Sequence, residues 1–393
     1  MNSAILDHQV QQYIQENLNT DMAKLVFKKS PFAGISTKEL AEQIAGKKAA
    51  EKKLPAWFNT PGIYFPPKIA IEQSSSAQTA LYKSKIVPAQ LVIDLTGGMG
   101  VDSLYFAKQA KQLVHVEQQS ELSAIAAHNS KILGVDNIEF ISATAENYLK
   151  TTKNTWDLIY LDPSRRIASQ KVFKLSDCEP NIVALQSELL QRSPYVLVKT
   201  APLLDIRSGL SELHKVREIQ VISLNNEMKE LLWLLDASFE GSEPNIKCIS
   251  LTATGEKSFS FKLSIEKALQ LPSYSAVQQF LYEPDAAWLK AGCFKLITQQ
   301  YQLGKLHQHT HLYTSDNLKS EFPGKQFKVI NVWPYKEFIQ QNHINKANVI
   351  SRNFPLTVEE LKKKHAIKDG GDIYLFFCTN HRNELSVIQA ERI

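Results

Sequence analysis

The spacing of hydrophobic and polar residues divides this chain into three parts, and the first is helical in pattern. Residues 1 to about 85 are polar and charged, with a helix expected to begin at Ser36 or Thr37, because Glu39 follows near its first turn. The stretch TPGIYFPPK at 60–68 has the proline and glycine residues typical of a loop. We expect this loop to lead into the next domain.

From about residue 90, short apolar runs alternate with helical stretches. The runs lie at 91–95, 111–117, 137–143, 156–162, 194–200 and 218–224, and the helical candidates at 102–110, 120–133 and 180–192. This alternation predicts an α/β fold with a mostly parallel sheet and crossover helices. Because the central runs are apolar almost throughout, we expect both faces of the sheet to be covered.

The pattern becomes less regular toward the C-terminus. Residues 245–263 predict an antiparallel hairpin around Thr254 and Gly255, whereas 227–235 fit either a helix or a strand. After about 270 the composition changes, and the tail from about 322 reads as strand, helix, Gly-Gly turn, strand and strand. We therefore predict four parts: a helical region at 1–85, the α/β domain at 86–268, and small α+β modules at 269–320 and 321–393.

Composition narrows the class of protein. The 393 residues are 44% hydrophobic and 22% charged, with a net charge of +5, which is ordinary for a soluble protein and compatible with an anionic partner. The four cysteines are far apart and form no CxxC pair, so neither a zinc site nor a dithiol motif is indicated. The N-terminus lacks a signal-peptide pattern, and no run of about 18 apolar residues predicts a membrane span. A cytoplasmic protein is expected.

A glycine-rich loop follows the first apolar run. DLTGGMGVD, residues 94–102, places Gly97, Gly98 and Gly100 at the end of a predicted strand, where the backbone can approach a ligand closely. The spacing differs from the G-x-G-x-x-G of dinucleotide-binding loops, which disfavours a pyrophosphate ligand. Asp94 and Asp102 suit a cationic amino-acid ligand better. A structural turn is the alternative for the loop taken alone.

Two more acidic residues end neighbouring strands of the predicted sheet. Glu117 ends the run at 111–117 and can accept hydrogen bonds from both hydroxyls of a ribose. Asp162 and Pro163 follow the run at 156–162, at the edge where open α/β sheets bind ligands. Taken singly, Glu117 could be a surface residue and Asp-Pro a plain turn. Their arrival in order after the glycine loop favours a shared ligand site.

Together these residues resemble the class I S-adenosylmethionine-dependent methyltransferases, whose fold is Rossmann-like. The resemblance covers about residues 85–265 and includes LDPSRR, which is similar to the Asp-Pro-Pro motif of the nucleic-acid branch. It implies S-adenosylmethionine as cofactor, with the ribose on Glu117 and the adenine beside 142–148, where Thr144 replaces the usual acid or Glu146 takes its place. The residues implied in cofactor binding are Asp94, Thr96, Gly97, Gly98, Gly100, Glu117, Thr144, Ala145 and Asp162.

The whole chain also resembles a bacterial group of methyltransferases with a THUMP-like module at the C-terminus. This resemblance rests on DLTGGMGVDS, LDPSRR, KTAPLLDI and the tail from about 322, with a ferredoxin-like segment near 272–320. THUMP modules are associated with RNA binding, so the resemblance implies an RNA substrate. LDPSRR is similar, too, to a motif of RNA uracil-C5 methyltransferases, which need a nucleophilic cysteine. We interpret the nearest candidate, Cys178, as a small buried side chain.

The resemblance assigns candidate roles in catalysis. The Asp162 carboxylate and the Pro163 carbonyl could accept the N–H protons of a base amine and free its lone pair. The aromatic residue that usually follows is replaced by Ser164, so Arg165 or Arg166 could stack on a base or bind a phosphate, unless they pair with Asp177 or Glu179. Lys199 could neutralise a phosphate, hold Asp162 in place, or form a purely structural ion pair.

Two further motifs leave alternatives open. His307, His309 and His311 alternate as on a strand and could bind a metal, although we expect no metal. Lys362 to His365 on a helix could contact RNA or form a solvated face. We predict a methyltransferase that acts on a base in RNA. The alternatives are a methyltransferase for a small molecule or protein and a non-catalytic RNA-binding protein.

Overall fold

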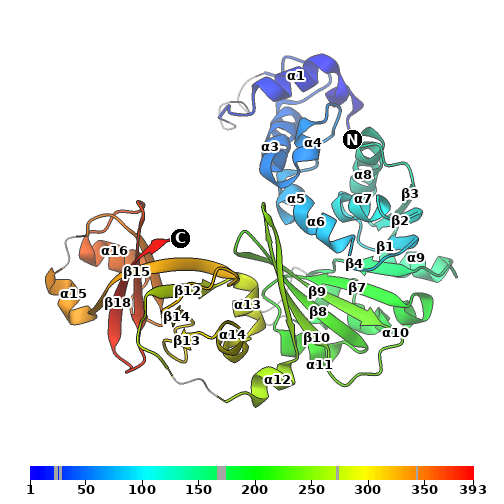
Figure 1. Ribbon diagram of the computed structural model, residues 1–393. Coiled ribbons are helices and arrows are strands. Elements are labelled where there is room, and N and C mark those ends of the chain that lie inside the picture. The colour runs from blue at the N-terminus through cyan, green and yellow to red at the C-terminus, as the bar shows by residue number, and fades with distance from the viewer. Residues whose placement is uncertain (22–24, 26–28, 166–173, 271–273, 342–343) are drawn as a thin grey trace. The chain divides into compact units, whose positions relative to one another are not determined.

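The computed structural model describes residues 1–393 except 22–24, 26–28, 166–173, 271–273 and 342–343 (Figure 1). The chain forms two compact units. One comprises Met1–Glu218 and Leu232–Ser242, and the other comprises Ile219–Leu231 and Glu243–Ile393. The finer division into four domains stays a prediction.

Short helices form the N-terminal part of the first unit. They are η1 (Ser3–Leu6), α1 (His8–Glu16), α3 (Thr37–Lys53), α4 (Pro55–Asn59), α5 (Lys68–Gln73) and α6 (Ala77–Lys83). The predicted helix start is confirmed: Ser36 caps α3, and a capping box with Glu39 satisfies backbone N–H groups that the first turn leaves free. Residues 61–67 form the expected loop.

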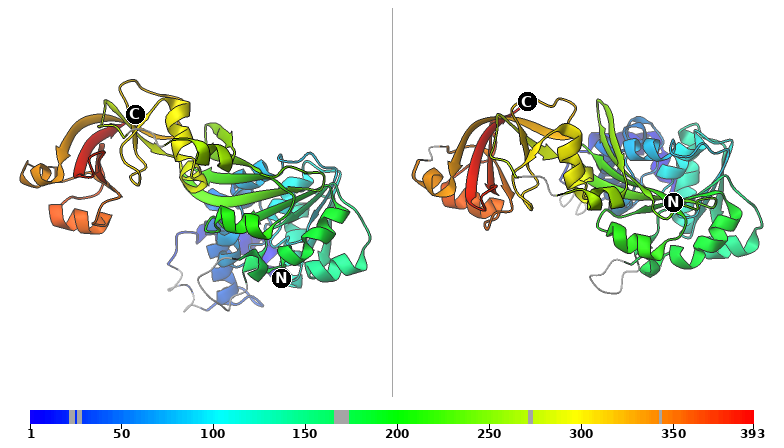
Figure 2. Two further views of the ribbon diagram at one scale, coloured as in Figure 1. Left: turned by 90° about the horizontal axis from the view of Figure 1, so that it is seen from below. Right: turned by 60° about the horizontal axis from the view of Figure 1, so that its bottom comes forward.

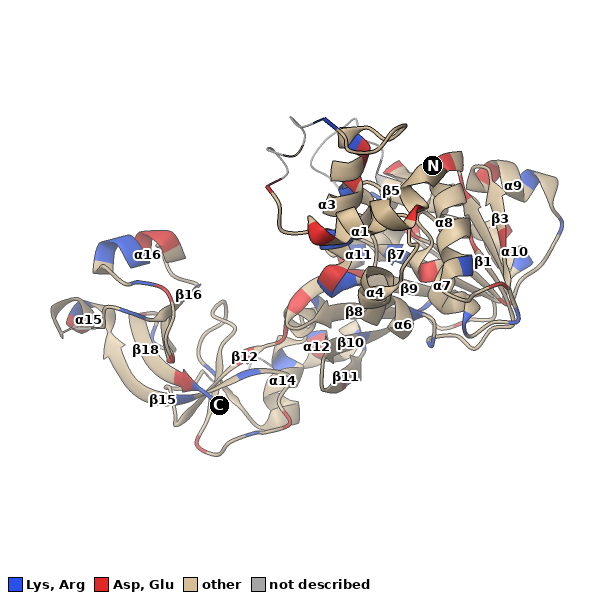
Figure 3. Ribbon diagram, turned by 90° about the horizontal axis from the view of Figure 1, so that it is seen from above, with Lys and Arg blue, Asp and Glu red and all other residues tan. Residues whose placement is uncertain are grey.

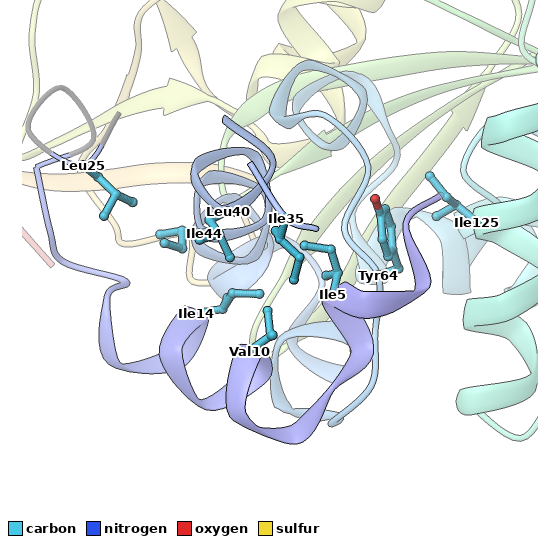
Figure 4. Close-up of a cluster of buried hydrophobic side chains, with 9 residues drawn as sticks. All are labelled: Ile5, Val10, Ile14, Leu25, Ile35, Leu40, Ile44, Tyr64 and Ile125. Carbon is cyan, nitrogen blue, oxygen red and sulfur yellow. The ribbon is translucent and has the colours of Figure 1, made fainter. Parts of the chain in front are cut away.

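These helices are packed on the α/β domain. Figure 4 shows a hydrophobic cluster that extends from Ile14 of α1 and Ile44 of α3 to Tyr64 and Ile125, the last belonging to α8 (Ser120–Ile132). The backbone of Tyr64 donates to Asn129 Oδ1 at 2.9 Å and accepts from Asn129 Nδ2 at 2.8 Å. Because Asn129 is buried and both of its amide atoms are paired, this contact fixes the helical region on α8.

A nine-stranded sheet has the order β11-β10-β8-β9-β7-β4-β1-β2-β3. Its strands are β1 (Leu91–Asp94), β2 (Gln112–Glu117), β3 (Ile138–Ser142), β4 (Leu158–Leu161), β7 (Tyr195–Thr200), β8 (Val216–Leu224), β9 (Glu227–Asp236), β10 (Asn245–Thr252) and β11 (Gly255–Phe261). The strands from β3 to β7 pair in parallel, as predicted. β10 and β11 form the predicted antiparallel hairpin, and the ambiguous residues 227–235 belong to a strand.

Helices cover both faces of the parallel strands. The other helices of this domain are α7 (Val101–Ala107), α9 (Ala145–Thr151), α10 (Ile182–Arg192) and α11 (Ile206–Glu212). Figure 1 shows α7 and α8 on one side of the sheet and α10 and α11 on the other. Together these elements form a Rossmann-like α/β fold. The strand order reverses between β1 and β4, and such a reversal opens a crevice at the carboxyl ends of the strands.

The C-terminal residues form a second, seven-stranded sheet of order β13-β14-β12-β15-β18-β17-β16. β15 and β18 pair antiparallel, and their ribbons run side by side in Figure 2. The elements are α12 (Leu263–Ala268), β12 (Phe280–Pro284), α13 (Ala286–Ala291), α14 (Phe294–Tyr301), β13 (Gly304–Lys305), β14 (Tyr313–Ser315), β15 (Gly324–Pro334), α15 (Tyr335–Gln341), β16 (Asn348–Arg352), α16 (Val358–His365), β17 (Ile373–Thr379) and β18 (Leu385–Arg392).

The predicted order of elements in the tail was incomplete. It included β15, α16, β17 and β18 but omitted α15 and β16, and both omitted elements are short, with one buried residue each. Elements this short carry too little hydrophobic periodicity to be recognised in the sequence. Within the described residues, none of the helices has the length and hydrophobicity needed to span a membrane.

Candidate functional site

A cavity of about 270 Å³ lies at the carboxyl ends of β1, β2 and β4. The predicted site residues on its wall are Asp94, Thr96, Gly97, Gly98, Glu117, Thr144, Ala145 and Asp162. Gly100, Pro163 and Lys199 are not among the lining residues. Arg165 belongs by its backbone to β5 (Ser164–Arg165), but its side chain and the whole of Arg166 lie outside the described residues. The structure therefore brings the three predicted strand ends to one cavity.

The glycine loop is held closely against the strands. Gly97 N–H donates to the Val116 carbonyl at 2.9 Å, and the Gly97 carbonyl accepts from Gly100 N–H at 2.9 Å. A Cβ atom on Gly97 would lie 2.1 Å from Cε1 of His115, so no larger residue fits there. Gly98 and Gly100 have φ values of +54° and +87°, which glycine adopts without strain.

Asp94 is buried beneath this loop in a hydrogen-bonded chain. It accepts from Thr96 N–H at 3.0 Å and from Ser103 Oγ at 2.6 Å, and Ser103 Oγ lies 2.9 Å from His115 Nδ1. Burial raises the pKa of Asp94 to about 7 and lowers the pKa of His115 to about 3, so the imidazole is neutral. Because the Ser103 hydroxyl donates its single hydrogen bond to Asp94, its oxygen can only accept a hydrogen bond from His115 Nδ1.

Glu117 links the ends of β1 and β2. Its Oε2 accepts from Gly98 N–H at 2.9 Å, and its Oε1 accepts from Gln119 N–H at 2.8 Å. Each carboxylate oxygen has two lone pairs, so both oxygens keep a further acceptor site after these contacts. The side chain is therefore fixed in direction on the cavity wall and can still receive hydrogen bonds from a ligand.

Asp162 begins the segment that follows β4. Its N–H donates to Thr96 Oγ1 at 2.6 Å, and its carboxylate forms an ion pair with Lys199 Nζ. The Asp162 side chain is 35% exposed, whereas that of Lys199 is 11% exposed. This geometry fits two of the three alternatives for Lys199: that it holds Asp162 in place and that it forms a purely structural ion pair.

A two-stranded ribbon borders the cavity beside Asp162. In it, β5 pairs antiparallel with β6 (Cys178–Glu179), which follows the short helix η2 (Leu175–Asp177). Ser164 and Glu179 both line the cavity. Cys178 is half-buried, so the expectation of a buried thiol was wrong. The reason is that β6 belongs to this ribbon and not to the core sheet.

Other residues of the site were not found from the sequence. Ser75, at the corner between α5 and α6, lines the cavity, and the fully buried Lys83 of α6 lies 3.2 Å from Asp102. Asp102 also lines the cavity, and its charge is balanced within the protein by Lys83; its expected role beside a cationic ligand stays a prediction. The pattern near residues 75–83 indicates only a helix, and no local signal connects it to the glycine loop.

The histidine motif does not form the strand on which its metal-binding alternative depended. Residues 307–311 lie in the turn between β13 and β14. His307 Nε2 lies 2.8 Å from Asn383 Oδ1, while His311 stacks on Phe294 with ring centroids 3.9 Å apart. In the described part of the chain, no three His, Cys, Asp or Glu side chains are grouped as a metal would require.

The two alternatives for the basic end of α16, a solvated face and an RNA contact, both stay predictions. Figure 3 shows acidic residues at its start and basic residues at its end. Lys362 pairs with Asp369 at 2.7 Å, and Lys364 lies over the ring of Tyr335. These contacts are compatible with either alternative.

Known proteins are similar to two parts of this chain and to the whole. A family model of a ferredoxin-like domain matches residues 280–323, and a THUMP domain-like model matches residues 324–392. A solved structure from Porphyromonas gingivalis W83, described as a "putative methyltransferase", is 29% identical, with a TM-score of 0.88, over 100% of this chain and 98% of that one.

Two curated relatives share the name 23S rRNA (uracil(1939)-C(5))-methyltransferase RlmD. The protein of Shewanella sediminis (strain HAW-EB3) is 30% identical over 36% of this chain, and that of Photobacterium angustum (strain S14 / CCUG 15956) is 34% identical over 29%. The matches span 34% and 58% of the relatives' own lengths. The chain combines the class I methyltransferase fold with a ferredoxin-like and a THUMP-like domain at its C-terminal end.

Proposed function

We propose that this protein is an S-adenosylmethionine-dependent methyltransferase that methylates a base in RNA. The observation that carries the proposal is the cavity at the strand-order reversal, which Gly98, Glu117 and Asp162 all line. Ligands of open α/β sheets bind at this reversal. The volume of about 270 Å³ is near the lower end for ligand sites, which begins at about 300 Å³.

The cavity residues fit this cofactor in shape and charge. Bound S-adenosylmethionine would supply an activated methyl group on a cationic sulfonium. Carboxylates on the wall, among them those of Asp94 and Glu117, favour a cation. The remaining acceptor sites of Glu117 would receive the ribose hydroxyls, Asp94 would face the amino-acid end, and Thr144 and Ala145 would lie beside the adenine. The space beside Gly98 is open. A Cβ atom placed on this glycine would have the carbonyl oxygen of Thr96 as its nearest neighbour, at 3.9 Å.

The acceptor would be held by the residues that follow β4. Because methyl transfer from a sulfonium has a good leaving group, the protein acts mainly by orienting the acceptor and excluding water. The Asp162 carboxylate and the Pro163 carbonyl would accept the N–H protons of a base amine. Lys199 would keep the carboxylate in the direction that this contact needs.

An RNA substrate is supported by the THUMP-like domain and by the names of the curated relatives. Those names also favour a second candidate, methylation at C5 of uracil. That chemistry needs a cysteine nucleophile, and the half-buried Cys178 is next to Glu179 on the cavity wall. Substitution of Cys178 therefore distinguishes the two candidate methyl acceptors, a base amine and C5 of uracil.

Two measurements test the proposal. Calorimetric titration of the full-length protein with S-adenosylmethionine should give saturable binding, and Glu117→Ala should weaken it, because the ribose contact and the tie to Gly98 are both lost. Mass spectrometry of RNA nucleosides from cells without the gene should reveal one missing methylated nucleoside. The absence of cofactor binding would favour a non-catalytic RNA-binding protein. Cofactor binding with an unchanged nucleoside profile would favour a small-molecule or protein acceptor.

A further inference from the structure

A buried group of polar side chains connects the helical region to Lys199. The side chain of Lys83 is 0% exposed, and its Nζ lies 3.2 Å from Asp102 Oδ1 and donates to Ser75 Oγ at 2.8 Å. A charged amine is costly to bury unless its partners are also buried and well placed. Lys83 therefore has a specific task at this position, and the contacts indicate that it neutralises Asp102.

Ser75 is the junction of this group. Its Oγ donates to Asp102 Oδ2 at 2.8 Å and accepts from Lys83 Nζ at 2.8 Å and from Lys199 Nζ at 3.5 Å. Ammonium groups can only donate, so the single hydroxyl proton is directed to Asp102. Tyr160 OH donates to the same oxygen of Asp102 at 2.8 Å. Ser75 and Tyr160 thus both donate to Asp102 Oδ2.

Lys199 stands between two carboxylates. It contacts Ser75, which is bonded to Asp102, and it pairs with Asp162 at the cavity. Burial alone would raise the pKa of Asp102, but the charges of Lys83 and Lys199 and the nearby hydroxyl groups keep it below its usual value. Asp102 is therefore ionised. Without Lys83, Lys199 would have to neutralise the negative charge of Asp102. Asp102 and Asp162 would then compete for the ammonium group of Lys199.

We propose that Lys83 is a positioning residue of the active site. By neutralising Asp102, it leaves the ammonium group of Lys199 to Asp162, and so fixes the Asp162 carboxylate at the cavity. This inference rests on the proposed function in so far as Asp162 contacts the methyl acceptor. It also gives the N-terminal helical region a part in the site, since Lys83 and Ser75 both belong to that region.

A crystal structure of the Lys83→Met variant tests the ion-pair rearrangement without any cofactor. Methionine is close to lysine in length and removes only the charged end. We expect Lys199 Nζ to turn toward Asp102 and the Asp162 side chain to change its rotamer. If Lys199 stays paired with Asp162 in the variant, the proposed role of Lys83 is wrong.

Kinetics of the full-length protein separate positioning from stability. With RNA from cells lacking the gene and labelled S-adenosylmethionine, kcat of Lys83→Met should fall by about 10- to 100-fold, as expected for a misplaced reacting group. The dissociation constant of the cofactor should stay close to the wild-type value. Lys47→Met is the matched control: Lys47 is a buried lysine of the same region, 7% exposed and packed over Phe58, and its loss should leave kcat unchanged.

A double-mutant cycle completes the test. Because Lys83 acts through Lys199, Lys83→Met should have little further effect on kcat in a Lys199→Met background. Additive losses would contradict the proposal. If Lys83→Met fails to fold, Ser75→Ala replaces it in the same cycle, since it removes the junction hydroxyl and leaves both lysines. A wild-type protein that binds no cofactor refutes the proposed function, whereas the crystallographic result decides the role of Lys83 independently.

Discussion

Gly97 offers a severe test of the geometry beneath the glycine loop. In Gly97→Ala the new methyl group would meet three imidazole atoms of His115 at 2.1–2.6 Å. Neither side can move away easily. The Gly97 backbone is bonded to Val116 and Gly100, while the buried imidazole is bonded to Ser103 and lies against Phe140 with ring centroids 4.9 Å apart. The substitution must therefore strain the loop, the ring or both.

The size of the effect follows from the costs of overpacking. An extra methyl group in a tightly packed interior costs about 1–3 kcal/mol. If the strain stays in the folded protein, each 1 kcal/mol lowers the melting temperature by about 2–4 °C for a domain of this size. If the loop relieves the strain by leaving its position, cofactor binding weakens by about tenfold for each 1.4 kcal/mol.

Differential scanning calorimetry and titration with S-adenosylmethionine measure the two outcomes on one preparation. We expect Gly97→Ala to lose melting temperature, cofactor affinity or both. The His115→Ala variant supplies the control, because the double variant has room for the new methyl group. The melting temperature of the double variant, Gly97→Ala with His115→Ala, should lie close to that of His115→Ala alone. A Gly97→Ala protein equal to wild type in both assays would refute the packing described for the loop.

The remaining expectations concern the acids and the thiol at the cavity. Asp162→Ala should bind S-adenosylmethionine almost as wild type does, whereas methyl transfer should fall by about 10²- to 10⁴-fold, and unchanged transfer would remove Asp162 from the chemistry. Burial raises the pKa of Asp94 from 3.8 to about 7, so the folded protein keeps a proton that the unfolded chain releases. The stability that this proton contributes is complete below about pH 4 and is lost as the pH rises to about 7. Urea titrations measure the unfolding free energies of wild type and of Asp94→Asn. The wild-type value minus the Asp94→Asn value should decrease from about pH 4 to about pH 7. A difference that is flat with pH would contradict the burial of an ionisable Asp94. Cys178→Ala should keep methyl transfer if the acceptor is a base amine, and complete loss, with a covalent enzyme–RNA adduct in the wild type, would instead favour C5 of uracil.

The parallel strands of the first sheet could be predicted because each combines a short apolar run with a turn signal. The parallel order could be predicted as well, since strands joined by helices must cross over. The run at 227–235 was ambiguous because its charged start fits a helix as well as a strand. It becomes β9 through tertiary packing, in which Leu231 to Leu235 are all buried.

Only the part of the candidate site that lies at the ends of strands could be predicted from the sequence. Gly98, Glu117 and Asp162 each follow or end a strand, so the parallel topology brings them to one edge of the sheet. Ser75 and Lys83 reach the site from another part of the chain. The contact between Ser75 and Lys199 joins residues 124 positions apart, and no local pattern encodes such a distance.

Three of the carboxylates on the cavity wall, those of Asp94, Glu117 and Asp162, differ in what surrounds them, and this difference favours distinct roles. Asp94 is buried with a neighbouring hydroxyl, so its charge is costly until a cation arrives. Glu117 is held by two backbone N–H groups, which fix its direction and leave acceptor sites open. Asp162 is the most exposed of the three and already has a cationic partner in Lys199. An ammonium group suits the first, neutral hydroxyl groups suit the second, and a base amine suits the third, because a paired carboxylate attracts a hydrogen-bond donor without binding a second cation.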